Sequence, residues 1–229
     1  MEQYKYQMHT HTKPCSRCGL MTPYELCKGL YDNGYKGAVL TNHFMHGNTG
    51  IDRGLPWEEF VGAFEKDYFE CLEAAKEFDL DILFGIEEVV VPGLEILCYG
   101  ITPKILYDNP ELGTWGLEKR VKILRDNGVV VIQAHPYREA SYIPNPGPLP
   151  IELVDGIEVY NLGNSKNEMN IKARELAKEN PHLITTSGAD AHWAECIPYG
   201  GIVTKKRIRT AKELADTLKN REFEAIIPY

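Results

Sequence analysis

Short apolar runs alternate with amphipathic segments along most of the chain. The apolar runs predict strands at residues 4–9, 37–41, 81–86, 94–101, 129–134, 156–160, 183–187, 200–204 and 222–227. Apolar residues at helical spacing predict helices at residues 23–33, 57–78, 115–127, 165–180 and 209–220. Because strands and helices alternate, the pattern predicts an α/β fold with a largely parallel sheet and right-handed crossovers.

Residues with turn and capping preferences support several of these boundaries. Thr22 and Gly34 bracket the first predicted helix, and Thr114 and Gly128 bracket the third. The segment 81–101 differs, because its two strands flank a short Val-Pro-Gly turn, which predicts a local hairpin.

Composition narrows the class of protein. The chain has 229 residues and a net charge of −8, with 43% hydrophobic residues, as in ordinary globular proteins. We find no linker and expect a single domain over residues 1–229, in which the proline-rich stretch 143–150 is a surface loop bordering a site. The acidic balance argues against strong non-specific nucleic-acid binding.

Localisation follows from what the sequence lacks. No apolar run is as long as the ~18 residues that a membrane span needs, and the amino terminus lacks the profile of a secretory signal. We therefore expect a cytoplasmic protein without a membrane partner, whose six cysteines are free thiols. Cys15 and Cys18 form a C-x-x-C pair, but no second pair completes a four-cysteine zinc site. The oligomeric state stays open.

Histidines and carboxylates gather at the ends of the predicted strands. In α/β folds the carboxyl ends of parallel strands form a shared rim, where functional sites are built. Imidazole nitrogens and carboxylate oxygens are ligands for divalent transition metals. The sequence therefore predicts a metal site at this rim. The residues at the strand ends are His9, His11, His43, Glu87, Glu88, His135, Asp190 and His192, and Glu158 lies within a predicted strand.

Five short motifs resemble those of the PHP family, the polymerase-and-histidinol-phosphatase superfamily of metal-dependent phosphoesterases. They are His9-Thr-His11, Thr41-Asn-His43, Gly85-Ile-Glu87, Ala134-His-Pro136 and Ser187-Gly-Ala-Asp-Ala-His192, in the family's order. The resemblance implies a distorted (β/α)7 barrel that carries two or three divalent metal ions, Zn, Mn or Fe, at its carboxyl rim.

The resemblance also implies the ligands of each metal. One set is His9, His11, Glu87 and Asp190; His43 and His192 contribute to a second metal, and Glu87 with His135 to a third.

Two places depart from the family pattern. Where many members have a further histidine this chain has Arg17, which cannot ligate a cation, so that Cys15 or Cys18 is the available substitute. The usual histidine before the His135 position is also missing, and Glu95 is the best-matching oxygen donor.

The implied activity is metal-dependent hydrolysis of a phosphate monoester or diester in a small phosphorylated substrate, nucleotides included. Clustered metals suit this reaction because they activate water and neutralise charge on phosphate oxygens. We expect Asp190 and His192 to orient the nucleophile, and Arg17 and Arg138 to bind the phosphoryl group. Weaker candidates are Glu88, Glu158 and Asn161 for orienting ligands, and Tyr137 and Tyr160 for stacking on a base or sugar.

Three alternatives stay open. The first is a narrower activity, histidinol-phosphate phosphatase, which the same fold supports. The second is a non-catalytic PHP-type interaction module, although such domains usually lose their ligands. The third is a metal-dependent amidohydrolase, which normally needs a lysine or similar bridging ligand on a middle strand; none is evident at the strand ends.

Overall fold

The computed structural model describes residues 3–114 and 116–228, and their strands form one mixed sheet. The order across the sheet is β7-β6-β5-β4-β3-β2-β1-β8-β9. All of the predicted strands are present. Their bounds are β1 Tyr4–Thr10, β2 Gly37–Leu40, β3 Asp81–Val91, β4 Leu94–Tyr99, β5 Val130–Gln133, β6 Gly156–Asn161, β7 Ile184–Gly188, β8 Ile202–Thr204 and β9 Phe223–Ala225.

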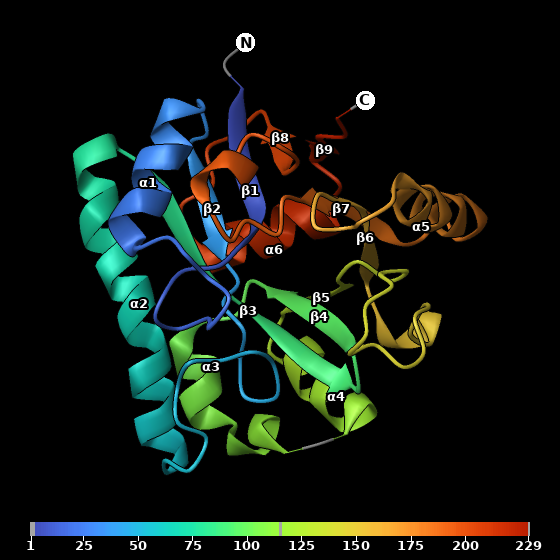
Figure 1. Cartoon of the computed structure of the whole chain (residues 1–229), viewed down its shortest axis with the longest axis horizontal. Coiled ribbons are helices and arrows are strands. Elements are labelled where there is room, and N and C mark those ends of the chain that lie inside the picture. Colours follow the sequence, from blue (N-terminus) through green and yellow to red (C-terminus); the bar gives the residue numbers. More distant parts are fainter. Residues whose placement is uncertain (1–2, 115, 229) are drawn as a thin grey trace.

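The helices pack on the outside of the sheet and at one end of it. Figure 1 shows α1 and α2 side by side along one flank, with α5 at the opposite side of the molecule. The five predicted helices are confirmed, and α3 is an addition that the sequence pattern did not predict. Their bounds are α1 Pro23–Asp32, α2 Trp57–Phe78, α3 Pro103–Asp108, α4 Leu117–Asp126, α5 Asn167–Glu179 and α6 Ala211–Lys219.

The predicted amino-terminal cap of α4 is wrong. Gly116, not Thr114, is the cap residue of α4, and Thr114 ends a preceding 3₁₀ turn, Pro110–Gly113. The Thr114 backbone N–H and hydroxyl both bond the carbonyl of Glu111, so the threonine serves that turn instead. Trp115, where this helix was predicted to begin, lies outside the described residues.

The sheet is a nearly closed, distorted barrel. Strands β1–β2–β3 and β5–β6–β7 are parallel, whereas β4 runs antiparallel to both β3 and β5, as the predicted hairpin requires. The backbone N–H of His11 donates to Ala191 (2.9 Å), and the N–H of Ala191 donates to His9 (3.0 Å). These bonds join the segment after β7 to the end of β1. Strands β1 to β7 therefore nearly close into a barrel.

An apolar core fills the barrel beneath its rim. Tyr6, Leu83 and Leu97 point inward and pack with Leu214 and Leu218 of α6. Alternate residues of a strand share a face. The inward-facing positions of β3 and β4 therefore change from Leu83 and Leu97 in this core to Glu87 and Glu95 at the opposite end of the barrel. The polar rim lies directly on the apolar core.

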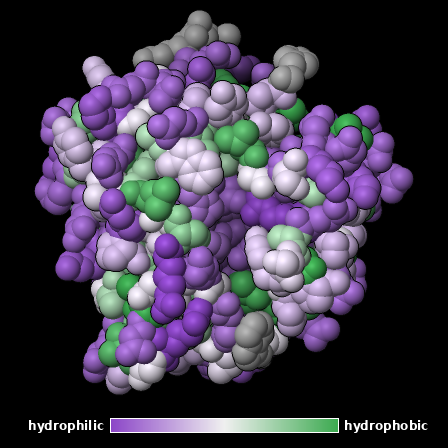
Figure 2. Space-filling model, viewed as in Figure 1, coloured by the Kyte–Doolittle hydropathy of each residue, from purple (hydrophilic) through white to green (hydrophobic). Residues whose placement is uncertain are grey.

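The view in Figure 2 shows a largely hydrophilic surface. Among the residues that the structure describes, no helix combines the length and apolar character needed to cross a membrane. Hydrophilic side chains line the central hollow of the face in Figure 2, and hydrophobic side chains lie in separate patches around it.

The packing of α2 against the sheet provides a test of the fold. Phe60 is fully buried and packs on Phe44 with ring centroids 5.4 Å apart, whereas Phe69 of the same helix is 50% exposed. We expect Phe60→Ala to lower the free energy of unfolding by about 3–5 kcal/mol, because it leaves a cavity. Phe69→Ala should change it by about 1 kcal/mol or less. Urea unfolding would measure both; equal losses would contradict this assignment of the core.

Candidate metal centre

The first cluster of ligand atoms joins the end of β1 to β3 and to the segment after β7. His9 Nε2 lies 3.1 Å from Glu87 Oε1 and 3.4 Å from Asp190 Oδ1. His11 Nε2 lies 3.3 Å from Glu87 Oε2 and 3.1 Å from Asp190 Oδ1. All four residues are buried. Adjacent ligands of a tetrahedral cation with bonds of about 2.1 Å are roughly 3.4 Å apart, so this spacing fits one cation.

A second cluster adjoins the first and shares Glu87. His135 Nε2 lies 3.1 Å from Glu87 Oε1 and 3.5 Å from Glu95 Oε2. His43 Nδ1 approaches the same two carboxylates, at 3.0 Å and 3.6 Å. Glu95 reaches the rim because β4 is antiparallel, which places the start of that strand beside the carboxyl ends of its neighbours. The predicted oxygen donor is therefore in position.

A third cluster lies at the open side of the centre. One ring nitrogen each of His11, His43 and His192 falls within 4.8 Å of the others. The Cys18 thiol is 3.1 Å from His192 Nε2. His43, His192 and Cys18 also line a cavity of about 560 Å³ above the centre. All seven predicted metal ligands thus lie in three contiguous clusters.

Unpartnered buried atoms test whether these residues fit a cation. Among the described residues, His9 Nε2, His11 Nε2, His43 Nδ1 and Glu87 Oε2 are buried without a hydrogen bond. His11 Nε2 and His43 Nδ1 lie 3.3 Å and 3.0 Å from Glu87 Oε2, and His9 Nε2 lies 3.1 Å from the other oxygen of Glu87. Buried polar atoms are normally satisfied. A divalent cation bound between these atoms would accept their lone pairs and so satisfy them.

The charge balance of the centre points the same way. Burial opposes ionisation of Glu87, but the neighbouring His9 and His43 hold the pKa of Glu87 well below its usual range. Burial and the charge of Glu87 raise the pKa of Glu95 to about 8. With Asp190, three carboxylates share one buried volume, and this concentration of negative charge suits divalent cations.

Hydrogen bonds fix the orientation of the His11 ring. The Ser16 hydroxyl donates its proton to Asn42 Oδ1 (2.8 Å), so its oxygen must accept from His11 Nδ1–H (3.2 Å). The same oxygen accepts from the backbone N–H of His43 (3.0 Å). His11 therefore presents Nε2 as a lone pair. Neither Ser16 nor Asn42 was predicted from sequence as part of the site, although both lie beside or within the motifs.

His9 and His192 are oriented in the same way. His9 Nδ1 lies 3.1 Å from Glu158 Oε1, a carboxylate held by the Asn161 side chain at 2.7 Å. His192 Nδ1 lies 2.7 Å from the backbone oxygen of Asp190, which can only accept. Carboxylate and carbonyl partners of this kind fix the tautomer of metal-binding histidines. Glu158 and Asn161, both weak candidates by sequence, hold ligands in place.

Two residues of the centre have strained backbones. His135 and Asp190 have φ angles of 27° and 52°, in the region that favours glycine. The turn at His135 follows directly on β5, and the turn at Asp190 follows β7. Strain of this kind persists where the surrounding structure enforces it and is common at functional sites.

Arg138 contacts the centre through Asp190. Its Nη2 donates to Asp190 Oδ2 at 2.7 Å and to Asn161 Oδ1 at 2.6 Å, while its Nε lies 3.4 Å from Asn164 Oδ1. Arg138 also lines the cavity above the clusters. The guanidinium thus positions a ligand and faces the space where a substrate would lie.

Two predicted neighbours of the clusters are wrong. The Arg17 side chain is exposed and is not among the residues lining the cavity, because the loop turns so that Cys18 faces His192 instead. Cys15 is buried in the apolar core, with its Sγ directed at the backbone oxygen of Phe64. Of the two cysteines, only Cys18 lies at the centre.

Other candidates have separate partners. Glu88 pairs with Arg120 and His46, on the opposite face of β3 from Glu87. Tyr137 is partly buried outside the three clusters. Tyr160 lines a different cavity, described next.

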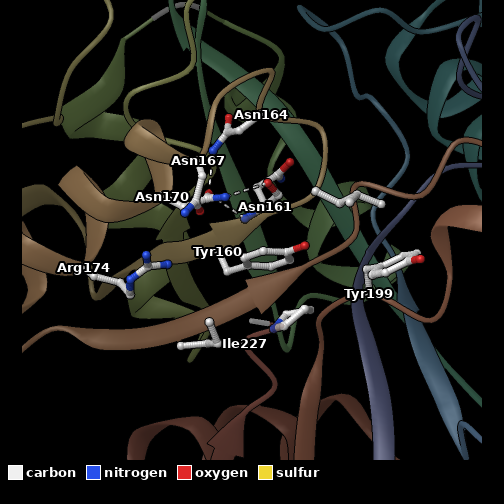
Figure 3. A pocket seen from close by; sticks show the side chains of 10 residues that line it. Tyr160, Asn161, Asn164, Asn167, Asn170, Arg174, Tyr199 and Ile227 are labelled. Carbon is white, nitrogen blue, oxygen red and sulfur yellow. Dashed lines mark hydrogen bonds between the residues drawn. The ribbon is translucent and has the colours of Figure 1, made fainter.

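A larger cavity of about 810 Å³ lies behind the centre, between the end of β6 and α5. Figure 3 shows Asn161, Asn164 and Asn170 joined by hydrogen bonds at its wall, with Tyr160 and Arg174 beside them. Asn161 and Asn164 contact Arg138 from this side. This amide network therefore separates the cavity from the metal centre and supports Arg138.

No protein-family model and no curated protein sequence matches the chain. Solved structures do. One is a two-domain protein from Bacteroides vulgatus ATCC 8482 described as containing a predicted PHP-like metal-dependent phosphoesterase, with a TM-score of 0.70 and 17% identity over 99% of this chain. The chain has the fold of the PHP-like proteins.

Two further structures share this PHP-like fold. The lesion-specific endonuclease PfuEndoQ from Pyrococcus furiosus has a TM-score of 0.63 and 11% identity over 98% of this chain. PsfC from Pseudomonas syringae PB-5123 has a TM-score of 0.65 and 14% identity over the whole chain. The chain spans 65% of the Bacteroides protein, 58% of the endonuclease and 93% of PsfC. The likeness confirms the fold that the sequence motifs imply.

The Glu158–His9 contact gives a prediction about metal affinity. Glu158→Gln keeps the shape of the side chain but sets an amide N–H against either His9 Nδ1–H or the donors at Oε2. We expect a 10- to 100-fold weaker affinity for divalent cations, the usual cost of losing such a partner. Competition with a chromogenic chelator would measure it. Glu152→Gln, in a 3₁₀ turn away from the centre, is the control; equal affinities for both variants would contradict the assigned role.

Close packing at Gly188 gives a second prediction. A Cβ at this position would lie 2.5 Å from Glu158 Oε1 and 2.5 Å from the Cβ of His9. Gly188→Ala should therefore displace His9 and reduce the number of tightly bound cations, measured by elemental analysis after dialysis. Gly62→Ala, which would meet only the tip of Tyr107 at 3.3 Å, should leave metal content unchanged. Full metal content in Gly188→Ala would contradict this packing argument.

Proposed function

We propose that the protein is a metal-dependent phosphoesterase that hydrolyses a small phosphorylated substrate, nucleotides included. The observation that carries this proposal is the convergence of three clusters of histidine and carboxylate ligands around the shared Glu87, beneath an open cavity. The PHP-like fold supports it, because the Bacteroides protein of this fold is described as containing a predicted metal-dependent phosphoesterase.

In this proposal the ligands hold two or three divalent cations. His9, His11, Glu87 and Asp190 hold one, and Glu87 with Glu95 and His135 holds a second. Glu87 belongs to both sets and would be a ligand in each. When bound, such cations lower the pKa of a coordinated water and neutralise charge on phosphate oxygens. Zn, Mn and Fe all suit mixed nitrogen and oxygen ligands.

The chain itself supplies orientation and charge. Arg138 keeps Asp190 in place through Nη2, and its Nη1 is not used in the contacts to Asp190, Asn161 or Asn164. The Tyr142 side chain also contacts this guanidinium at the cavity. We assign Nη1 to a phosphoryl oxygen, since guanidinium donors match phosphate geometry. The buried histidines and the apolar floor of the barrel exclude bulk water from below.

The cavity favours small substrates. Its volume of about 560 Å³ is within the usual range for small-molecule sites. His46, Tyr142 and Gly93 are among the residues around it. Phosphomonoesters, including histidinol phosphate, and phosphodiesters are the substrates to compare. The alternative of a non-catalytic interaction module predicts no hydrolysis of any of them.

The proposal is tested with p-nitrophenyl phosphate and bis(p-nitrophenyl) phosphate. Removal of metal with EDTA should abolish hydrolysis, and added Zn²⁺ or Mn²⁺ should restore it. Asp190→Asn should lower kcat at least about 100-fold, because it removes a ligand charge. His182→Asn, at an exposed histidine away from the clusters, is the matched control and should keep full activity. Unchanged turnover in fully stripped protein would overturn the proposal.

A further inference from the structure

The ligands at the open side of the centre are incomplete if histidines alone are counted. His11 Nε2 is close to both the His9–Glu87–Asp190 cluster and the His43–His192 pair. One nitrogen lone pair serves one cation, and Ser16 occupies the other nitrogen of His11. Since His11 Nε2 lies 3.1–3.3 Å from Asp190 and Glu87, it belongs to their cluster.

His43 belongs to two groups of ligand atoms, one with Glu87 and Glu95 and one with His11 and His192. Glu87 and Glu95 supply two carboxylates, and His135 Nε2 lies within 3.5 Å of both. Because His135 already supplies an imidazole to these carboxylates, we assign His43 to the open side, in the group that it forms with His192. Two imidazoles alone form a weak site, because catalytic metal sites usually have three protein ligands and one open position.

Cys18 occupies the place of the missing third ligand. Its Sγ lies 3.1 Å from His192 Nε2 and is also within hydrogen-bonding reach of His43. His192 directs a lone pair at the sulfur, since its Nδ1 is committed to the Asp190 carbonyl. Cys18 is partly exposed and lines the same cavity as both histidines. The other five cysteines of the chain are buried.

We propose that Cys18, His43 and His192 form a mixed thiolate–imidazole site for a third cation at the mouth of the cavity. The inference rests on the proposed metal centre and deepens it, because it names a ligand that decides which metal binds. Thiolate ligands favour Zn²⁺, Co²⁺ and Fe²⁺ over Mn²⁺ and Mg²⁺, which prefer oxygen. Cys18, His43 and His192 all line the cavity in which a substrate would bind.

Cobalt substitution tests the site through a spectroscopic signature that does not depend on activity. Stripped protein is titrated with Co²⁺ under argon, and bound cobalt is counted by elemental analysis. The wild-type protein should develop the near-ultraviolet charge-transfer band of a thiolate–Co²⁺ bond. Cys18→Ser should lose this band and bind one cobalt fewer. Cys18→His should recover the cobalt count without the band.

Cys15→Ser is the matched control, because Cys15 lies three residues away in the same loop but is directed into the core. It should keep both the band and the cobalt count, with circular dichroism showing that each variant is folded; Cys196→Ala replaces it if the Cys15 variant unfolds. A band that survives in Cys18→Ser, or cobalt binding by the wild-type protein without any band, would overturn the inference.

The outcome is separable from that of the proposed function. A thiolate band that depends on Cys18, in a protein that hydrolyses no phosphate ester, would support the third site and reject the phosphoesterase activity. Metal-dependent hydrolysis, together with a cobalt spectrum that Cys18→Ser does not change, would support the phosphoesterase activity and reject the third site.

Discussion

The buried carboxylate of Glu87 is the interaction on which the rest of the centre depends. Its two oxygens lie within 3.3 Å of nitrogens from four histidines, His9, His11, His43 and His135. A charge buried this deeply is costly unless it is paired. Glu87 lies on β3, and the four histidines come from β1 and the residue after it, the loop after β2 and the turn after β5. The site therefore exists only when the barrel is nearly closed, and local structure alone cannot form it.

Closure in turn explains two features that are otherwise unfavourable. The backbone bonds between His9, His11 and Ala191 join the segment after β7 to the end of β1. Asp190 enters the centre from the strained turn that follows β7. Gly188 lets β7 approach His9 and Glu158 closely enough for this contact. Strain at Asp190 and the lack of a side chain at Gly188 are both consequences of bringing the carboxylate to the histidines.

The sequence predicted strands, helices and the seven histidine and carboxylate positions well because each has a local signature. Apolar runs mark strands, and polar residues at their ends mark the rim. Orienting partners such as Ser16 have no such signature, because a serine in a loop is common and its role depends on three neighbours in space. Glu95 was found by position, but its reason, the reversed direction of β4, depends on the hairpin. Arg17 and Cys15 were misplaced because loop direction is not encoded in spacing.

The difference between Arg17 and Cys18 shows how much chemistry one step along a loop can change. An arginine at the open side would add a fixed positive charge, repel a third cation and favour a site with two metals and a phosphate clamp. A cysteine adds a soft ligand and makes a third metal possible, leaving Arg138 as the cation beside the centre. The positive charge of Arg138 is already partly balanced by Asp190. The net charge that a phosphate meets at the cavity mouth would then depend on whether Cys18 holds a metal. Metal occupancy, more than fixed basic residues, would control how this acidic chain attracts an anionic substrate.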